Sequence, residues 1–421
     1  MSSSWMRGAG VLLMATVIGL AGACHPLPYE NPDSLPAVVS LPDGSPERLA
    51  MNARVYDAVV RTVELTFYDG TFNGVDFRAE AAVRRANAVA QPDEAKFYEA
   101  LNGTLNLLED GHTRAVRPTD NLLNKRWRLQ ASPTFGFAEN VVRSRSTGEV
   151  QTFIGRVREG GAAHDAGVRP GWRILSVDGR SWDAWDGRGD RDGKAYEFRF
   201  DDAAGRLHTR SLEARLMPRE LGTATRTADG VLVLRFMSFD APTADWLETR
   251  LAEAQTDRPR AVVLDIRGNG GGETRAGARI IGSFFSEPVV IGYVRTIFGQ
   301  HPDKARPGRV IWDGPLTIVQ SSLSASMSEV LSATIQEQGR GRVVGQTSGG
   351  RVVDTVAFAL PDGGQLLVGE SEFRTARGAV LEGRGVTPDI VVVPTYDDLR
   401  HGRDPMLDAA VRAALDISAN R

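Results

Sequence analysis

The sequence predicts an α/β protein with several domains, on three observations. The chain has 421 residues, which is too long for one ordinary hydrophobic core. From about residue 219 onward, short apolar runs of strand length alternate with helical patterns, as in a parallel sheet covered by helices. The part before residue 219 divides into a helical stretch and a stretch of short strands. We therefore expect an α/β domain preceded by two smaller domains.

The first 24 residues have the layout of a secretory signal that ends in a lipid-attachment site. Arg7 precedes an apolar stretch over 11–20, and small residues lead to Cys24, the only cysteine. This resembles a bacterial lipobox, which implies export, acylation of Cys24 and attachment to a membrane on its periplasmic side. His25 favours the outer membrane over the inner one. The alternatives are an uncleaved span, for which the apolar run is short, and an incidental cysteine.

Residues 25–48 and 49–128 differ in pattern. The first segment is rich in proline, serine and acidic residues without periodicity, and we expect a flexible tether. The second has helical patterns, with a helix opened by Pro92 and stopped by an Asp-Gly turn that presents His112. Its first helix carries an apolar stripe of period 3.6, formed by Val55, Val59, Val60, Val63 and Leu65.

Residues 129–218 read as short strands, and their centre holds a specific pattern. Residues 161–179 predict a short helix, a glycine- and proline-containing turn and an apolar strand ending in Asp-Gly. This resembles a PDZ domain, a module that adds a peptide strand to a sheet edge and captures its terminal carboxylate with backbone amides. The resemblance implies a capture loop at Phe135, Gly136 and Phe137. The alternative is a module that only packs on the following α/β domain or caps its cleft.

In residues 219–402 the expected strands are 231–236, 261–266 and 316–320, with helices over 244–254 and 326–338, and residues 403–421 form a terminal amphipathic helix. Ser326 stands where a strand gives way to a helix. Free amides at a helix start can stabilise a developing oxyanion. The alternative is a capping box made with Glu329.

Two glycine-rich segments accompany this serine. Residues 262–274 are a buried strand followed by a loop that contains Gly270 and Gly271, and such loops lie where α/β sites collect. The phosphate-loop alternative lacks the required glycine spacing and lysine. Residues 381–389 place Glu382 in a glycine-rich turn.

The three motifs, in this order, resemble the C-terminal processing (tail-specific) and tricorn-core serine peptidases. The resemblance implies a crotonase-like α/β domain, no cofactor and no metal. It also implies a serine endopeptidase for exported proteins or peptides whose C-termini the PDZ module engages, possible delivery by an adaptor lipoprotein, and a site formed when the helical domain closes on the α/β domain.

The residue that accepts the proton of the serine differs between the two branches of the family. Tail-specific members use a lysine where this chain has Arg351, and a guanidinium stays protonated at workable pH. The tricorn-like branch uses a histidine of the helical domain, matched here by His112, and an acidic residue, matched by Glu382. The implied set is Ser326 as nucleophile, His112 as base, Glu382 as its acidic partner, and the amides of Met327 and of the Gly270–Gly271 stretch as oxyanion donors. His112 as a helix cap and Glu382 as a solvated turn residue are the alternatives.

Several function classes are disfavoured. The net charge of −3, without a run of basic residues, does not predict a surface that binds nucleic acid. The histidines lack metal-ligand spacing. Two other classes stay open: a catalytically inactive lipoprotein that binds a peptide or lipophilic ligand, and an acyl-CoA enzyme, against which export argues.

Overall fold

The structure is a computed structural model that describes residues 27–31, 34–129, 131–143, 150–182, 194–296 and 299–419. The predicted signal and Cys24 lie outside the described residues. The chain forms two compact units. Unit 1 comprises Met1–Leu129, Tyr293–His301 and Val353–Phe373, and unit 2 comprises Gln130–Gly292, Pro302–Val352 and Arg374–Arg421.

Unit 1 is built on helices whose first turns are capped by the preceding side chain. Ser45, Asp76 and Asp93 each accept a hydrogen bond from a backbone amide in the first turn of the helix that follows. The predicted stripe is confirmed at three positions, since Val55, Val59 and Val63 are fully buried. It is wrong at Leu65, whose side chain is 45% exposed, because residues two apart on a helix, such as 63 and 65, do not share a face. The elements are α2 (Pro46–Thr66), η1 (Phe72–Gly74), α3 (Phe77–Val89), α4 (Glu94–Leu105), η2 (Asn106–Leu108) and α5 (Pro118–Leu129).

A small antiparallel sheet packs on these helices. Strand β1 (Arg114–Val116) pairs with β18 (Gln365–Thr375), and β18 pairs with β17 (Asp354–Ala359). The sheet continues to β13 (Val289–Thr296) and β14 (Gly299–Ala305) in the order β1-β18-β13-β14. Only helices are expected over 49–128, so β1 is a departure. A three-residue strand is too short to show an alternating pattern, and its pairing partner lies about 250 residues away.

The described residues after the predicted signal make defined contacts with unit 1, where the sequence predicts a flexible tether. Tyr29 forms a β-bridge with Phe358 and stacks on its ring at 5.1 Å. Glu30 forms an ion pair with Lys125 at 3.0 Å, and both side chains are only 6% and 5% exposed. Leu27 is buried in the core of the unit. A short backbone pairing and a few single side chains anchor this segment, so no periodic pattern in the sequence predicts that it is ordered.

Unit 2 begins with a β-rich region. Its sheet has the order β3-β4-β5-β7-β8, so β3 is an edge strand, and its core contains Phe135, Trp172 and Phe198. A separate ribbon joins β2 to β9. The elements are β2 (Ala131–Thr134), β3 (Phe137–Arg143), β4 (Val150–Val157), α6 (Ala162–Asp165), β5 (Arg173–Val177), β6 (Arg180–Ser181), β7 (Ala195–Asp201), β8 (Leu207–Glu213) and β9 (Arg215–Pro218).

The rest of unit 2 is a mixed α/β fold around one sheet of order β10-β11-β12-β15-β16-β19. Strand β10 is antiparallel to β11, and the other neighbours are parallel. One face packs on helix α11, where Val263 and Val319 share a core with Ala410. The strands are β10 (Gly222–Arg226), β11 (Val231–Phe236), β12 (Ala261–Asp265), β15 (Leu316–Gln320), β16 (Arg342–Gly345) and β19 (Ile390–Val391).

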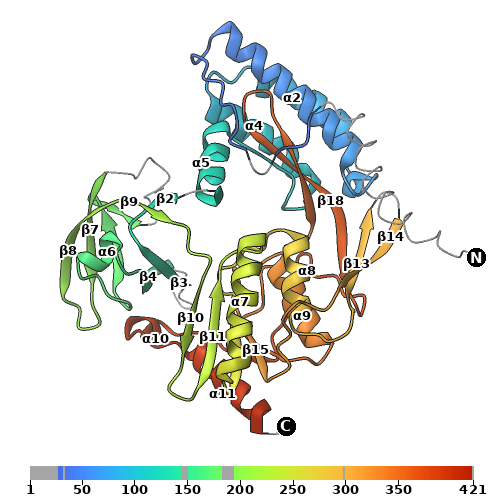
Figure 1. Ribbon diagram of the computed structural model, residues 1–421. Coiled ribbons are helices and arrows are strands. Elements are labelled where there is room, and N and C mark those ends of the chain that lie inside the picture. The colour runs from blue at the N-terminus through green and yellow to red at the C-terminus, as the bar shows by residue number, and fades with distance from the viewer. Residues whose placement is uncertain are drawn as a thin grey trace, which may run out of the picture. The chain divides into compact units, whose positions relative to one another are not determined.

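The helices of this region are α7 (Ala241–Asp257), α8 (Thr274–Gly282), α9 (Met327–Glu337), α10 (Tyr396–Arg400) and α11 (Pro405–Ala419) (Figure 1). The expected strands over 231–236 and 316–320 are confirmed, as is the helix that follows Ser326. No helix in the part of the chain that the structure describes is long and apolar enough to span a membrane. Because β12, β15 and β16 are parallel neighbours, the loops that follow them meet at one edge of the sheet.

Candidate functional site

Ser326 lies between β15 and α9 in a strained backbone conformation. Its φ of 55° and ψ of −122° lie in a region that residues with a side chain rarely adopt. The Ser326 N–H donates to the carbonyl of Arg351 at 2.7 Å. As the first residue inside α9, Met327 has an N–H without an intrahelical acceptor. The serine side chain is therefore presented beside an amide that can bind an anion.

The glycine-rich loop after β12 approaches this serine closely. Gly271 has φ of 100°, and a Cβ there would lie 2.6 Å from the Cβ of Ser326 and 3.0 Å from the N of Met327. Only glycine fits this approach. The amide of Gly271 donates to Oδ1 of Asn269 at 2.9 Å. The neighbouring amide of Gly270 is therefore the better oxyanion donor of the predicted pair.

Asn269 joins this loop to the start of α9. Its side chain is fully buried, and its Nδ2 donates to the carbonyl of Phe236 at 3.2 Å. Its own carbonyl accepts from the amide of Ala325 at 3.0 Å and from the hydroxyl of Ser328 at 2.9 Å. The loop and the serine turn are thus held in one arrangement by residues on both sides of Ser326.

Glu329 is a buried carboxylate that accepts four hydrogen bonds. Oε1 accepts from the hydroxyl of Ser348 at 2.6 Å and from the amide of Gly350 at 2.7 Å. Oε2 accepts from the amide of Arg351 at 2.8 Å and from that of Ser326 at 3.0 Å. The last of these is the contact that the capping-box alternative predicts. The other three tie the loop after β16 to the serine turn.

Glu382 lies in the same unit and is connected to this network. Its Oε2 accepts from the amide of Val352 at 2.7 Å. The amide of Gly383 donates to the carbonyl of Gly350 at 2.8 Å. The residue just before Val352 is the one whose carbonyl accepts the Ser326 amide, so Glu382 is linked to the serine turn through a short stretch of backbone.

His112 lies in unit 1, in the turn after η2. Its backbone N–H donates to Oδ1 of Asp110 at 2.9 Å, and its ring Nδ1 lies 3.0 Å from the backbone carbonyl oxygen of Asp110. A carbonyl oxygen can only accept, so Nδ1 carries the proton in this contact. The neutral imidazole then has its lone pair on Nε2, which is the atom a general base requires.

One arginine and two aspartates form a charged cluster where the glycine-rich loop begins. Arg267 donates to both carboxylate oxygens of Asp265 and to both of Asp404, at distances of 2.6–2.8 Å. Burial would raise the pKa of Asp265, but the Arg267 guanidinium holds it below the ordinary value. The same cluster raises the pKa of Arg267 despite its burial. The base of the loop is therefore pinned by paired charges.

Phe135, Gly136 and Phe137 lie where the chain enters the edge strand β3. Phe135 is buried, and Gly136 has φ of 80° with no room for a side chain, because a Cβ would lie 2.7 Å from Cα of Gly161. The amide of Gly136 donates to the hydroxyl of Thr134 at 3.1 Å. The loop is thus built for close backbone packing, and the outer edge of β3 is unpaired in the described sheet.

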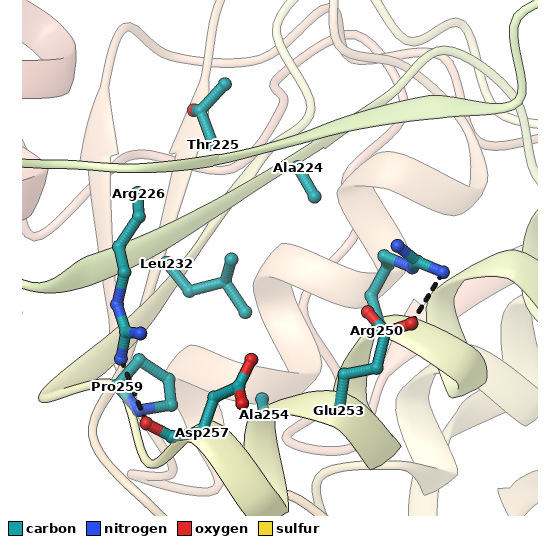
Figure 2. Close-up of a pocket in the computed structure, with 9 residues that line it drawn as sticks. All are labelled: Ala224, Thr225, Arg226, Leu232, Arg250, Glu253, Ala254, Asp257 and Pro259. Atoms are coloured by element: carbon teal, nitrogen blue, oxygen red, sulfur yellow. Dashed lines mark hydrogen bonds and ion pairs between the residues drawn. The ribbon is translucent and has the colours of Figure 1, made fainter.

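A cavity elsewhere in unit 2 contains none of the predicted site residues. It lies between β10, β11 and α7 (Figure 2). Arg226 in its wall donates to the carbonyl of Asp257, and Arg250 pairs with Glu253 at 2.8 Å. Both arginines of its wall already bond other residues of the wall, so we assign it no chemistry.

The structure brings together five of the predicted residues and shows others that the sequence did not indicate. Ser326, Met327, Gly270, Gly271 and Glu382 belong to one network in unit 2, whereas His112 has its own support in unit 1. The supporting residues that sequence analysis missed are Asn269 and Ser348, and Glu329 was considered only as a cap. A signal existed for Glu329, because it is a lone acid within an apolar helical stretch.

Residues 230–392 match the family model for peptidase family S41. A carboxyl-terminal-processing protease of Picosynechococcus is 25% identical over 357 residues, which cover 79% of this chain and 81% of that protein. Among solved structures, the photosystem II D1 C-terminal processing protease has a TM-score of 0.56 at 22% identity, covering 81% of this chain and 93% of that one. The tricorn protease has a TM-score of 0.51 at 14% identity, covering 88% of this chain and 37% of that one. Both structural similarities show the fold.

Proposed function

Because this chain belongs to peptidase family S41 and is a serine peptidase, we propose that it hydrolyses peptide bonds with Ser326 as nucleophile and His112 as general base. The observation that carries the proposal is the serine turn. Ser326 has a strained backbone at a helix start, a glycine lies against its Cβ, and a buried carboxylate fixes its amide. A helix that needs only a cap requires none of this strain.

The proposed reaction is an acyl transfer in two steps. Ser326 Oγ attacks the peptide carbonyl carbon while Nε2 of His112 accepts the hydroxyl proton. The oxyanion is bound by the amides of Met327 and Gly270. The C–N bond then breaks, and the leaving amine takes the proton from the imidazolium. Water next attacks the acyl-enzyme, with His112 again as base, and releases the acid.

Glu382 is the proposed acidic member of the site. A carboxylate here stabilises the imidazolium that forms in each step, directly or through a neighbour. Its bond to the Val352 amide supports this role, because that bond fixes one carboxylate oxygen close to the serine turn. Arg351 contributes its backbone to the turn, and its guanidinium is not a proton acceptor.

The β-rich region is the proposed PDZ module, and the α/β region the proposed crotonase-like catalytic domain. The position of β3 at the edge of the described sheet and the glycine packing at Gly136 support the first assignment, since a peptide can add to an edge strand while amides at its start bind the C-terminal carboxylate. The substrates are then exported proteins or peptides. The export and acylation of Cys24, with an adaptor lipoprotein as a further partner, complete the proposal.

The test is covalent labelling of the full chain, purified in detergent, with a fluorophosphonate probe. Wild type should be labelled at Ser326, and Ser326→Ala and His112→Ala should lose the label. Ser322→Ala and His164→Ala are matched controls at exposed positions and should keep it. Arg351→Ala should also keep it. A folded wild type that takes no label would contradict the proposal and favour the inactive binding protein.

A further inference from the structure

The turn that carries His112 is closed by one buried carboxylate. Asp110 is only 4% exposed, and its Oδ1 accepts from the amides of His112 at 2.9 Å and Thr113 at 2.8 Å. Its Oδ2 accepts from the hydroxyl of Thr113 at 2.5 Å. Three donors from two residues, His112 and Thr113, therefore converge on one side chain, which leaves the peptide groups of the turn little freedom.

This turn is also anchored to the sheet. The Thr113 hydroxyl, which donates to Asp110, accepts from the amide of Gly369 on β18 at 3.0 Å. The carbonyl of Gly369 in turn accepts from the amide of Tyr68 at 3.1 Å. A Cβ on residue 369 would lie 2.7 Å from Oδ2 of Asp110, so the carboxylate fits here only because that residue is glycine.

The anchored turn determines where the carbonyl of Asp110 points. That carbonyl lies 3.0 Å from Nδ1 of His112 and can only accept. It fixes the ring orientation and places the ring proton on Nδ1. The side chain and the carbonyl of the same residue therefore act together: the first holds the turn, and the second holds the imidazole.

We infer that Asp110 is a positioning residue for His112, holding its imidazole in the Nδ1–H tautomer so that Nε2 can accept the serine proton. The inference rests on the proposed role of His112, and it assigns to Asp110 and its partner Thr113 a function that neither residue type predicts by itself. The contacts that position His112 all lie within unit 1, so they do not require a bound substrate.

The variants that test it are Asp110→Asn and Thr113→Val, with Thr113→Ser as the conservative rescue. Asparagine keeps the shape but presents an NH2 group where Oδ2 accepts the hydroxyl, and valine removes the hydroxyl. Asp76→Asn is the matched control, because Asp76 also accepts a backbone amide, from Ala79 at 3.1 Å, in the same unit. All variants are made in the full chain, so Thr113→Val keeps the test decisive if Asp110→Asn does not fold.

The first readout is the kinetics of fluorophosphonate labelling at Ser326. We expect the maximal labelling rate to fall about tenfold in Asp110→Asn and Thr113→Val, with the half-saturating probe concentration within about twofold of wild type. Thr113→Ser and Asp76→Asn should label at close to the wild-type rate. Wild-type rates in Thr113→Val, or an equal loss in Thr113→Ser or Asp76→Asn, would overturn the inference.

The second readout does not require activity. Nitrogen-15 NMR of histidine-labelled protein distinguishes Nδ1–H from Nε2–H, and His112→Gln identifies the signal. We expect Nδ1–H in wild type and a mixture of tautomers in Thr113→Val. A wild-type His112 that carries its proton on Nε2 overturns the inference even if the enzyme is active. An inactive wild type with the expected tautomer instead contradicts only the proposed function.

Discussion

Replacing Glu329 by glutamine tests whether this carboxylate holds the serine turn. The side chain is completely buried, and both of its oxygens accept two hydrogen bonds. Glutamine has the same shape, but one oxygen becomes an NH2 group that can only donate. Whichever way the glutamine amide is oriented, its NH2 group faces two groups that donate hydrogen bonds to the carboxylate in the wild type. The substitution therefore removes two hydrogen bonds without opening a cavity.

The size of the effect follows from these contacts. A hydrogen bond to a charged group contributes about 1.5–3 kcal/mol, and a buried donor without an acceptor costs about 1–3 kcal/mol. Orienting the amide towards Ser348 is the less costly choice, because that hydroxyl can accept as well as donate. We therefore expect Glu329→Gln to lower the free energy of unfolding by roughly 3 kcal/mol. If the strained φ of Ser326 depends on this carboxylate, labelling at Ser326 falls with it, by about tenfold or more.

The assay combines urea denaturation with fluorophosphonate labelling at a temperature where both proteins are folded. Glu337→Gln is the matched control, since Glu337 lies in the same helix and accepts one backbone amide, from Arg377 at 3.1 Å, near the surface. It should cost about 1 kcal/mol or less and leave labelling unchanged. A Glu329→Gln protein within 1 kcal/mol of wild type, labelled at the wild-type rate, would refute the reasoning.

Three further outcomes are expected. Gly271→Ala should reduce the rate of labelling roughly 100-fold, because the alanine Cβ would lie 2.6 Å from the Cβ of Ser326. Labelling at the wild-type rate would show that the loop can move away from Ser326. The depressed pKa of Asp265 contributes stability that is complete above about pH 3.9 and is lost as pH falls through the lower folded value. Urea denaturation below about pH 4 should therefore show a steeper loss for wild type than for Asp265→Asn, and parallel curves would count against the pairing. Lys125→Ala leaves the Glu30 carboxylate buried without its cation, with only amide donors such as Asn121, and should cost about 3 kcal/mol; a loss below 1 kcal/mol would mean that the N-terminal segment is not held there.

The elements around Ser326 could be predicted because their signals are local. An apolar run such as 231–236 or 316–320 identifies a buried strand by itself, and the helix after Ser326 carries its own start signal. Parallel strands then place the following loops at one edge. The resemblance of three ordered motifs supplied the roles of the residues in those loops.

The features that the sequence did not predict depend on contacts between residues that are far apart in the chain. Nothing near Arg114 indicates a strand, because its partner on β18 is Leu367. The sequence likewise gives no sign that residues 353–373 share a unit with the N-terminal helices. Asp110 has the residue type and position of an ordinary turn former. Its role depends on Gly369, whose missing side chain makes room for the carboxylate.

The course of the chain accounts for the long sequence separation between Ser326, the proposed nucleophile, and Glu382, its proposed acidic partner. The backbone that binds the Ser326 amide and the Glu329 carboxylate ends at Val352, and the next residue already belongs to unit 1. The chain then forms β17 and β18, which hold the turn of His112, and re-enters unit 2 at residue 374, shortly before Glu382. Glu382 binds the Val352 amide and so fixes the point at which the chain leaves unit 2. A loss of that bond should therefore loosen the serine turn and the point at which the chain leaves unit 2 together, and this coupling separates the proposed role of Glu382 from that of a carboxylate that acts only on an imidazolium.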